Sequence, residues 1–210
     1  MTRKLRSIRR KVVWGSGIVS VVLLSSIAFA GCGQAREGRG PVTLVMDSLT
    51  AASGAAPDEF GNVLASDVQT YVKVDEVKVP TVFEDPGRAT FHLQTKDAEY
   101  PTSPANAITL TRYRVTFSRA DGRNTPGVDV PYGFDGAISL TITNISSATF
   151  IIVRASAKSE TPLVALIGNG GSQYISAIAH VTFYGTDAAG NTVSVSGQMS
   201  VSFADWGDPV

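Results

Sequence analysis

The chain has 210 residues, with 18 lysines and arginines balancing 18 aspartates and glutamates, so its formal net charge is zero. Six of the basic residues lie in the first eleven positions, which hold no acidic residue, so the chain beyond position 11 has a net charge of about −6. Such an acidic chain is a poor ligand for nucleic acid and for anionic lipid, because both repel it. The only cysteine is Cys32, which excludes a disulfide within the chain.

The first 32 residues have the layout of a secretory signal. The basic start is followed by an uncharged stretch from 12 to 30, and its most apolar part, 18–30, has the length of a signal-peptide core. The sequence Phe29-Ala30-Gly31-Cys32 then resembles the lipobox of a bacterial lipoprotein precursor, in which an apolar residue and two small residues precede a cysteine. Phe29 departs from the usual leucine at its position.

This resemblance implies cleavage after Gly31 and lipidation of Cys32, which would hold the mature protein at a membrane because two or more acyl chains anchor stably. The uncharged stretch is also roughly long enough to cross ~30 Å of hydrocarbon as an uncleaved helix, which is the alternative topology. Arg9-Arg10 leaves open export in the folded state. Cleaved or uncleaved, the chain after Cys32 is expected outside the cytoplasm.

Residues 33–41 contain no large apolar side chain and are predicted to be a tether. A random coil of this length spans ~15–18 Å, which keeps a folded domain at 42–210 close to the membrane. Gly33 stands where an aspartate signals inner-membrane retention in enterobacterial lipoproteins. The outer membrane is therefore favoured if the organism has one.

From residue 42 onward the chain has the pattern of β-strands. We expect strands at 42–46, 68–74, 77–83, 89–93, 108–117, 136–142, 149–155, 178–186 and 192–203, with a turn-rich loop at 48–62. The last strand alternates apolar residues with serines, which indicates one buried and one wet face. In 108–117 the apolar parity switches between Leu110 and Tyr113, which predicts a bulge or a change of sheet.

Eight or nine strands with one short helix near 162–167 predict an all-β protein, a two-sheet antiparallel β-sandwich. We expect Thr161 to cap that helix, Pro162 to open it and Gly168 to end it. The turn Asp187-Ala-Ala-Gly-Asn191 between the last two strands resembles the D-x-A-G-N hairpin of bacterial immunoglobulin-like modules, which implies an immunoglobulin-like sandwich. The cysteine pair and central tryptophan of antibody domains are missing from the sequence.

Catalytic residues are hard to find in this sequence. His92 and His180 are the only histidines, and no Gly-x-Ser-x-Gly elbow accompanies them, so neither a catalytic triad nor a zinc site is predicted. The adjacent carboxylates Asp58-Glu59 and Glu84-Asp85 are the candidates for an envelope hydrolase acting on glycan or peptide. Neighbours along a strand point to opposite faces, so these pairs need not converge.

Oxygen-bearing side chains of the kind that calcium prefers gather in two groups of loop residues. The first group is Asp187, Asn191, Asp205 and Asp208, and the second is Asp121, Asn124, Asp129 and Asp135. Neither has the spacing of an EF-hand, and Asp and Asn also stabilise turns through their backbone. We expect no metal and no cofactor, and retain Asp187, Asn191 and Asp205 as the residues to examine for calcium.

The segment 119–135 is the most unusual loop, because it combines arginines and aromatic residues of the types enriched at binding surfaces. Its candidate partner-binding residues are Arg119, Arg123, Tyr132 and Phe134. Trp206, after the last strand, either plugs the end of the sandwich or stands exposed for a ligand. The leading prediction is a membrane-tethered, non-enzymatic binding or assembly module with an envelope protein as partner and no nucleic acid, and the envelope hydrolase is the alternative.

Overall fold

The computed structural model describes residues 40–97, 99 and 103–206, and strands of three β-sheets make up most of these residues. Residues 40–210 form one compact unit. Gly31, Cys32 and Asp208 lie outside the described residues. In the described part of the chain, no helix is both long and apolar enough to cross a membrane.

The described part of the chain is all-β, with only short helical turns between its strands. The strands are β1 (Val42–Ala51), β2 (Val63–Asp67), β3 (Thr70–Val74), β4 (Val77–Thr81), β5 (Asp85–Thr95), β6 (Ile108–Ser118), β7 (Phe134–Ile142), β8 (Ile145–Val153), β9 (Ile175–Asp187) and β10 (Thr192–Ala204). The helical turns are η1 (Pro104–Asn106), α2 (Ala155–Lys158) and η2 (Leu163–Leu166).

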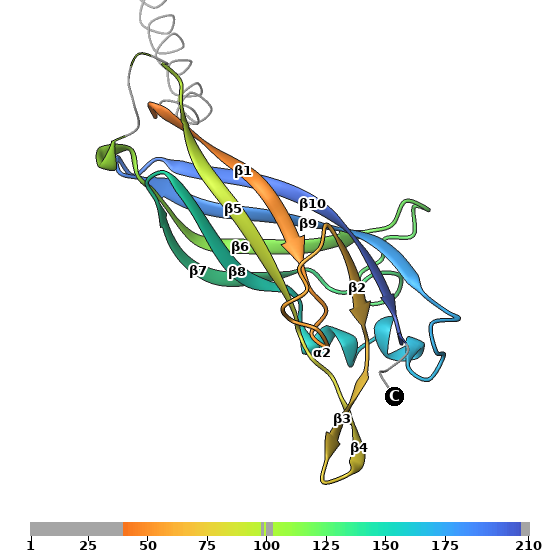
Figure 1. Ribbon diagram of the computed structural model, residues 1–210. Coiled ribbons are helices and arrows are strands. Elements are labelled where there is room, and N and C mark those ends of the chain that lie inside the picture. The colour runs from red at the N-terminus through yellow and green to blue at the C-terminus, as the bar shows by residue number, and fades with distance from the viewer. Residues whose placement is uncertain (1–39, 98, 100–102, 207–210) are drawn as a thin grey trace, which may run out of the picture. The chain divides into compact units, whose positions relative to one another are not determined.

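Two larger sheets face one another, as Figure 1 shows. One has the strand order β1-β5-β8, the other has the order β2-β10-β9-β6-β7, and β3 and β4 form a separate hairpin. The pairs are antiparallel except β2 with β10, which is parallel. The expectation of a wholly antiparallel arrangement is wrong at this pair, because the chain leaves the first sheet after β1 and enters the second beside β10, running in the same direction.

The core lies between the two larger sheets and is centred on aromatic rings. Phe183 of β9 packs against Phe91 of β5 and Phe150 of β8, with ring centroids 5.0 and 5.1 Å apart and the rings close to perpendicular. Edge-to-face pairs of this kind add about 0.5–1.5 kcal/mol beyond the area they bury. The alternating residues of β9 point either into this cluster or to solvent, so the period-two pattern decides which face is buried.

The predicted parity switch in the strand at 108–117 is confirmed as a bulge. The register of β6 against both β7 and β9 shifts between Leu110 and Arg112, so Leu110 and Tyr113 both face the core. A second shift, between Met46 and Ser48, carries β1 on to Ala51, five residues beyond its expected end. An extra residue restores the inward parity that a regular strand would lose.

Two other expected elements differ from the prediction. The strand expected at 68–74 is β3, which begins two residues later at Thr70 and lies in the hairpin, and β2 of the five-stranded sheet, which ends at Asp67, was not predicted. The helix expected near 162–167 is the 3-10 turn η2, and the α-helical turn α2 just before it was not predicted. Four residues are too short a segment to show helical periodicity.

Candidate functional site

The loop between β6 and β7 is held in shape by its own side chains. The Asn124 side-chain oxygen accepts a hydrogen bond from the Arg119 N–H at 2.6 Å, and the Asp129 carboxylate accepts one from the Thr125 N–H at 3.1 Å. Val130 is buried and anchors the loop to the domain. Residues 124 and 129 of the second calcium group therefore bond to the backbone of the loop, as turn-forming residues do.

Asp121 joins the two arginines of this loop. The Arg119 guanidinium donates to both carboxylate oxygens of Asp121, at 3.2 and 2.7 Å, and that of Arg123 donates to Oδ2 at 3.0 and 2.9 Å. The hydrogen bond from Arg119 is the main reason that the pKa of Asp121 is lowered to about 2. Both predicted arginines thus share one anionic partner, Asp121, and these three side chains together carry a single net positive charge.

The two predicted aromatic residues of this loop have different surroundings. Tyr132 is 53% exposed and covers Gly127, where an added Cβ would lie 2.3 Å from the tyrosine ring. Phe134 begins β7 and is buried, with its ring 6.2 Å from that of Tyr113 and under the Arg154 guanidinium. Phe134 therefore belongs to the core. The expectation that Phe134 lies on the binding surface with Tyr132 is wrong.

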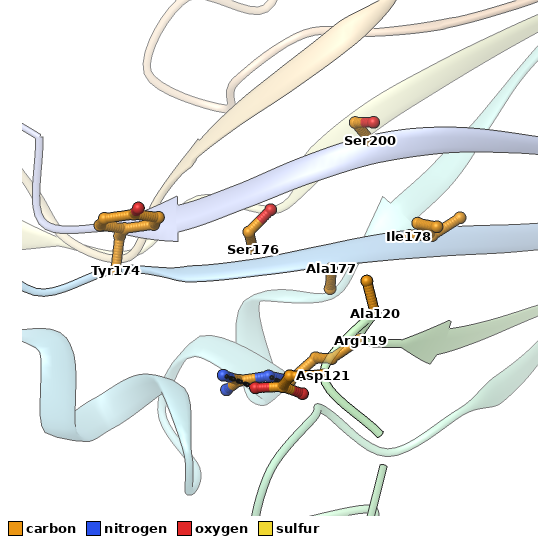
Figure 2. Close-up of a pocket in the computed structure, with 8 residues that line it drawn as sticks. All are labelled: Arg119, Ala120, Asp121, Tyr174, Ser176, Ala177, Ile178 and Ser200. Atoms are coloured by element: carbon orange, nitrogen blue, oxygen red, sulfur yellow. Dashed lines mark hydrogen bonds and ion pairs between the residues drawn. The ribbon is translucent and has the colours of Figure 1, made fainter. Parts of the chain in front are cut away.

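A shallow, open cleft of about 500 Å³ lies beside the start of this loop. Figure 2 shows its lining, which consists of Arg119, Ala120 and Asp121 from the loop, Ser176, Ala177 and Ile178 from β9, Ser200 from β10 and Tyr174 just before β9. Its polar groups are hydroxyls and an arginine–aspartate pair that bond to each other. The cleft offers hydrogen-bonding groups to a polar ligand, but no paired acid and base for a reaction.

The residues examined for calcium do not come together. The Asp187 carboxylate accepts hydrogen bonds from the N–H groups of Ala189 and Asn191 and from the Asn191 side-chain amide, at 2.8–2.9 Å. The Asn191 side chain is the main cause that lowers the pKa of Asp187. Asp205 accepts the Gly168 N–H at the far end of β10, about 40 Å away at ~3.3 Å per strand residue. Asp187 and Asn191 therefore shape a turn.

In the second group, Asp135 binds Arg112 and Arg114 on the outer face of the sheet, at 3.3 and 3.0 Å. Within residues 40–97, 99 and 103–206, no three side chains of His, Cys, Asp or Glu are grouped as metal ligands would be. Trp206 is half-buried, and its backbone N–H donates to Asp67 at 3.1 Å. The tryptophan therefore lies against the end of β2.

The two histidines lie on different sheets. His92 of β5 contacts the Asp47 carboxylate at 2.6 Å, and His180 of β9 contacts the Ser118 hydroxyl at 2.6 Å. The adjacent carboxylates proposed for hydrolysis also differ in environment, since Asp85 is fully buried and Glu84 is exposed. The two histidines and the carboxylates proposed for hydrolysis thus lie in different parts of the domain and in different environments.

A buried ion pair joins Asp85 to Lys158, a residue that the sequence did not single out. Lys158 Nζ lies 2.7 Å from Asp85 Oδ1 and 2.7 Å from the Asp67 carbonyl oxygen. Ser66 Oγ donates to Asp85 Oδ2 at 2.5 Å, and the Gly54 N–H donates to Oδ1 at 2.8 Å. Burial raises the pKa of Asp85, although Lys158 opposes the rise. Lysine is rarely buried, so a sequence pattern gives no sign of it.

The β3–β4 hairpin presents an apolar face to solvent. Val72 lies opposite Val79 and Val74 opposite Val77, so the four valines share one face, and each is 37–63% exposed. Lys73 and Lys78 lie on the opposite face, which also contains Tyr71 and Pro80. The sequence shows valine alternating with lysine in these strands. This alternation predicts one apolar and one polar face, but it does not predict whether the apolar face is covered.

Comparison with known proteins identifies no relative from which a function can be carried over. The chain matches no known family and no curated protein. A similar solved structure is the X-ray structure of Northeast Structural Genomics Consortium target SoR45, with 10% identity, coverage of 78% of this chain and 86% of that one, and a TM-score of 0.31. A likeness this weak supports no argument about family or function.

Proposed function

We propose that this protein is a lipid-anchored module of the cell envelope that binds or assembles with another envelope protein and has no enzymatic activity. The chain is cleaved after Gly31, Cys32 carries the lipid, and the outer membrane is the favoured location. The support for the anchor is the sequence of residues 29–32 after a basic start and an uncharged stretch. The two facing sheets and the turn at 187–191 support an immunoglobulin-like arrangement.

The exposed valine face of the β3–β4 hairpin is the observation that carries the binding role. An isolated two-stranded hairpin is marginally stable in water, and contiguous exposed apolar surface is typical of interaction sites. The hairpin belongs to neither larger sheet and lies at the end of the domain opposite the start of β1 (Figure 1). A partner protein that covers the four valines would stabilise the hairpin and remove them from water.

A hydrolytic role has less support than a binding role. Asp85, whose pKa is raised by burial, is fully buried against Lys158 and has no access to a glycan or a peptide. Asp58 and Glu59 are exposed on the loop after β1. General acid–base catalysis requires two groups that face one substrate atom, and these carboxylates do not provide them.

Crosslinking in native membranes tests the binding role. In full-length protein, Val72→Ser together with Val79→Ser is expected to reduce the recovery of the crosslinked partner about tenfold, because apolar contact at the centre of an interface carries much of the affinity. Val63→Ser is the matched control, because Val63 is 62% exposed on β2, outside the hairpin. Equal capture by wild type and the hairpin variant, with circular dichroism unchanged, would exclude the hairpin as the docking surface.

The loop surface of Arg123 and Tyr132 is tested separately. Both side chains are exposed, so Arg123→Ala with Tyr132→Ala leaves the core intact. If the loop contributes to binding, the loop variant recovers less of the crosslinked partner than wild type does. The loss in the hairpin variant then measures the contribution of the hairpin separately. Capture that survives the loop variant and fails in the hairpin variant assigns the interface to the hairpin alone.

Lipidation is tested with Cys32→Ser. The expected result is a precursor that is neither labelled by fatty acid nor cleaved at Gly31, because the thiol is the acceptor and its modification precedes cleavage. The readouts are metabolic labelling and the mobility of the chain on a gel. A Cys32→Ser protein that is still cleaved and stays with membranes after a carbonate wash would contradict the anchor.

A further inference from the structure

The buried contact between Asp85 and Lys158 lies at the junction of the two larger sheets. Asp85 begins β5 of the three-stranded sheet, Ser66 lies in β2 of the five-stranded sheet, and Lys158 ends α2 between them. Asp85 is 0% exposed and Lys158 is 1% exposed. In the described part of the chain, these two are the only charged residues that are buried.

Burial makes the charged forms of this pair costly. Removing an ammonium and a carboxylate from water costs several kcal/mol for each ion, and only partners in the interior offset the cost. Transfer of one proton across the 2.7 Å from Lys158 Nζ to the Asp85 carboxylate leaves a neutral amine beside a carboxylic acid. These are the forms of the two groups that react to make an amide.

The groups around the pair suit this condensation. The Gly54 N–H holds Oδ1 at 2.8 Å and would stabilise the negative charge that develops there as the amine attacks. Ser66 Oγ–H holds Oδ2 at 2.5 Å, where it can deliver a proton to the departing oxygen. The Asp67 carbonyl accepts a hydrogen bond from Nζ at 2.7 Å and orients the amine. Gly54 must be glycine here, because a Cβ would lie 2.4 Å from the Glu84 carbonyl oxygen.

We propose that Lys158 and Asp85 condense in the folded domain to form an intramolecular isopeptide bond. Lys158 Nζ attacks Asp85 Cγ, the Nζ–Cγ bond forms and the Cγ–Oδ2 bond breaks. Oδ2 leaves as water, with the hydrogen of the carboxylic acid and one hydrogen of the amine. The step exchanges no electrons and requires no further reactant. Ser66 is a positioning and proton-relay residue for the leaving oxygen.

Such a bond would crosslink a domain that has no pair of cysteines to form a disulfide. A protein outside the cytoplasm is in a compartment that permits disulfides, but the only cysteine is Cys32. Asp85 and Lys158 are 73 residues apart in the chain, so their bond would close a long loop and lower the conformational entropy of the unfolded state. It would also tie β5, the central strand of the three-stranded sheet, to α2, which follows β8.

Mass spectrometry of the full chain tests the bond. With cleavage after Gly31 and the lipid on Cys32 included in the calculated mass, the wild-type protein is expected to be one water molecule lighter than the same chain without the bond, and trypsin should fail to cleave after Lys158. Digestion should instead release a branched peptide that joins the segments containing Asp85 and Lys158. A folded wild-type protein with the full calculated mass, cleaved normally after Lys158 once denatured, would overturn the proposal without any variant.

Three variants identify the atoms involved. Lys158→Arg keeps the positive charge but cannot form the amide, so it should have the full calculated mass. Asp85→Asn should lose one ammonia in place of one water, because the amide nitrogen becomes the leaving group. Ser66→Ala should slow the appearance of the crosslinked form after refolding, while leaving its final mass unchanged. A water loss that persists in Lys158→Arg would place the bond elsewhere and overturn the assignment.

Discussion

Asp121 shows how single side chains organise a loop that the sequence identifies only as unusual. Its carboxylate receives two guanidinium groups and the Arg123 N–H, so the loop carries its charges in an internal cluster. Asp187 has a similar role, because its carboxylate accepts the Asn191 N–H and closes the β9–β10 turn. Residues that the sequence offers as ligands are used here to satisfy the backbone.

We expect the Asp121 carboxyl to titrate near pH 2, below its ordinary value of 3.8. Because the folded pKa is the lower of the two, the ionised group stabilises the loop above about pH 4, and this contribution is lost as the pH falls through about 2. The side-chain carboxyl carbon shift in an NMR titration measures it. Arg119→Gln should raise the pKa more than Arg123→Gln, and an unchanged pKa in Arg119→Gln would contradict the assigned cause.

At the scale of elements, the hairpin β3–β4 differs most from the rest of the domain. Its strands pair with each other alone, and its turn places Asp75 and Glu76 at positive φ, 46° and 65°. A two-residue hairpin turn with both central residues at positive φ favours Asn-Gly, because other residues adopt this backbone at a cost. The natural sequence therefore leaves the hairpin less stable than the fold permits.

Replacing the two turn residues tests whether the turn limits the stability of the hairpin. Asp75→Asn with Glu76→Gly should slow the exchange of the amide hydrogens in β3 and β4, because the new residues adopt the turn with less strain. Hydrogen exchange followed by mass spectrometry measures the change. Glu76→Ala is the control and should give no protection, since alanine gains nothing at positive φ. Equal exchange in the Asn-Gly variant and in wild type would show that the turn does not limit hairpin stability.

At the scale of the whole molecule, the two larger sheets are joined by the aromatic cluster around Phe183. Its ring meets Phe91, Phe150 and Tyr113 at centroid distances of 5.0, 5.1 and 6.0 Å. The contacts come from β5, β6, β8 and β9, so the cluster connects both layers. Loss of this ring removes contacts from each sheet at once.

Phe183→Ala should therefore lower the free energy of unfolding by about 3–5 kcal/mol, the usual cost of removing a large buried ring. Urea denaturation measures the loss. Tyr184→Ala is the matched control, because Tyr184 is the next residue of β9 and points to the outer face, under the Arg112 guanidinium. Its cost should stay below about 1 kcal/mol. Similar losses in the two variants would contradict a core centred on Phe183.

Local pattern accounts for the parts of this fold that the sequence predicts. The alternation in β9 and β10, the bulge of β6 and the turn at Asp187 follow from period-two side-chain geometry and from turn chemistry, which act over a few residues. The lipobox-like segment ending at Cys32 is also a local pattern, and its function remains a prediction from sequence.

Tertiary structure alone decided which charges and which apolar faces are buried. Asp85 and Lys158 meet across 73 residues, and Phe134 turns into the core, while the valines of β3 and β4 stay in solvent. Asp187 and Asp205 lie beyond opposite ends of β10, so the length of that strand separates them. The alternating pattern of a strand defines two faces, but only the packing of distant strands determines which of the two is covered.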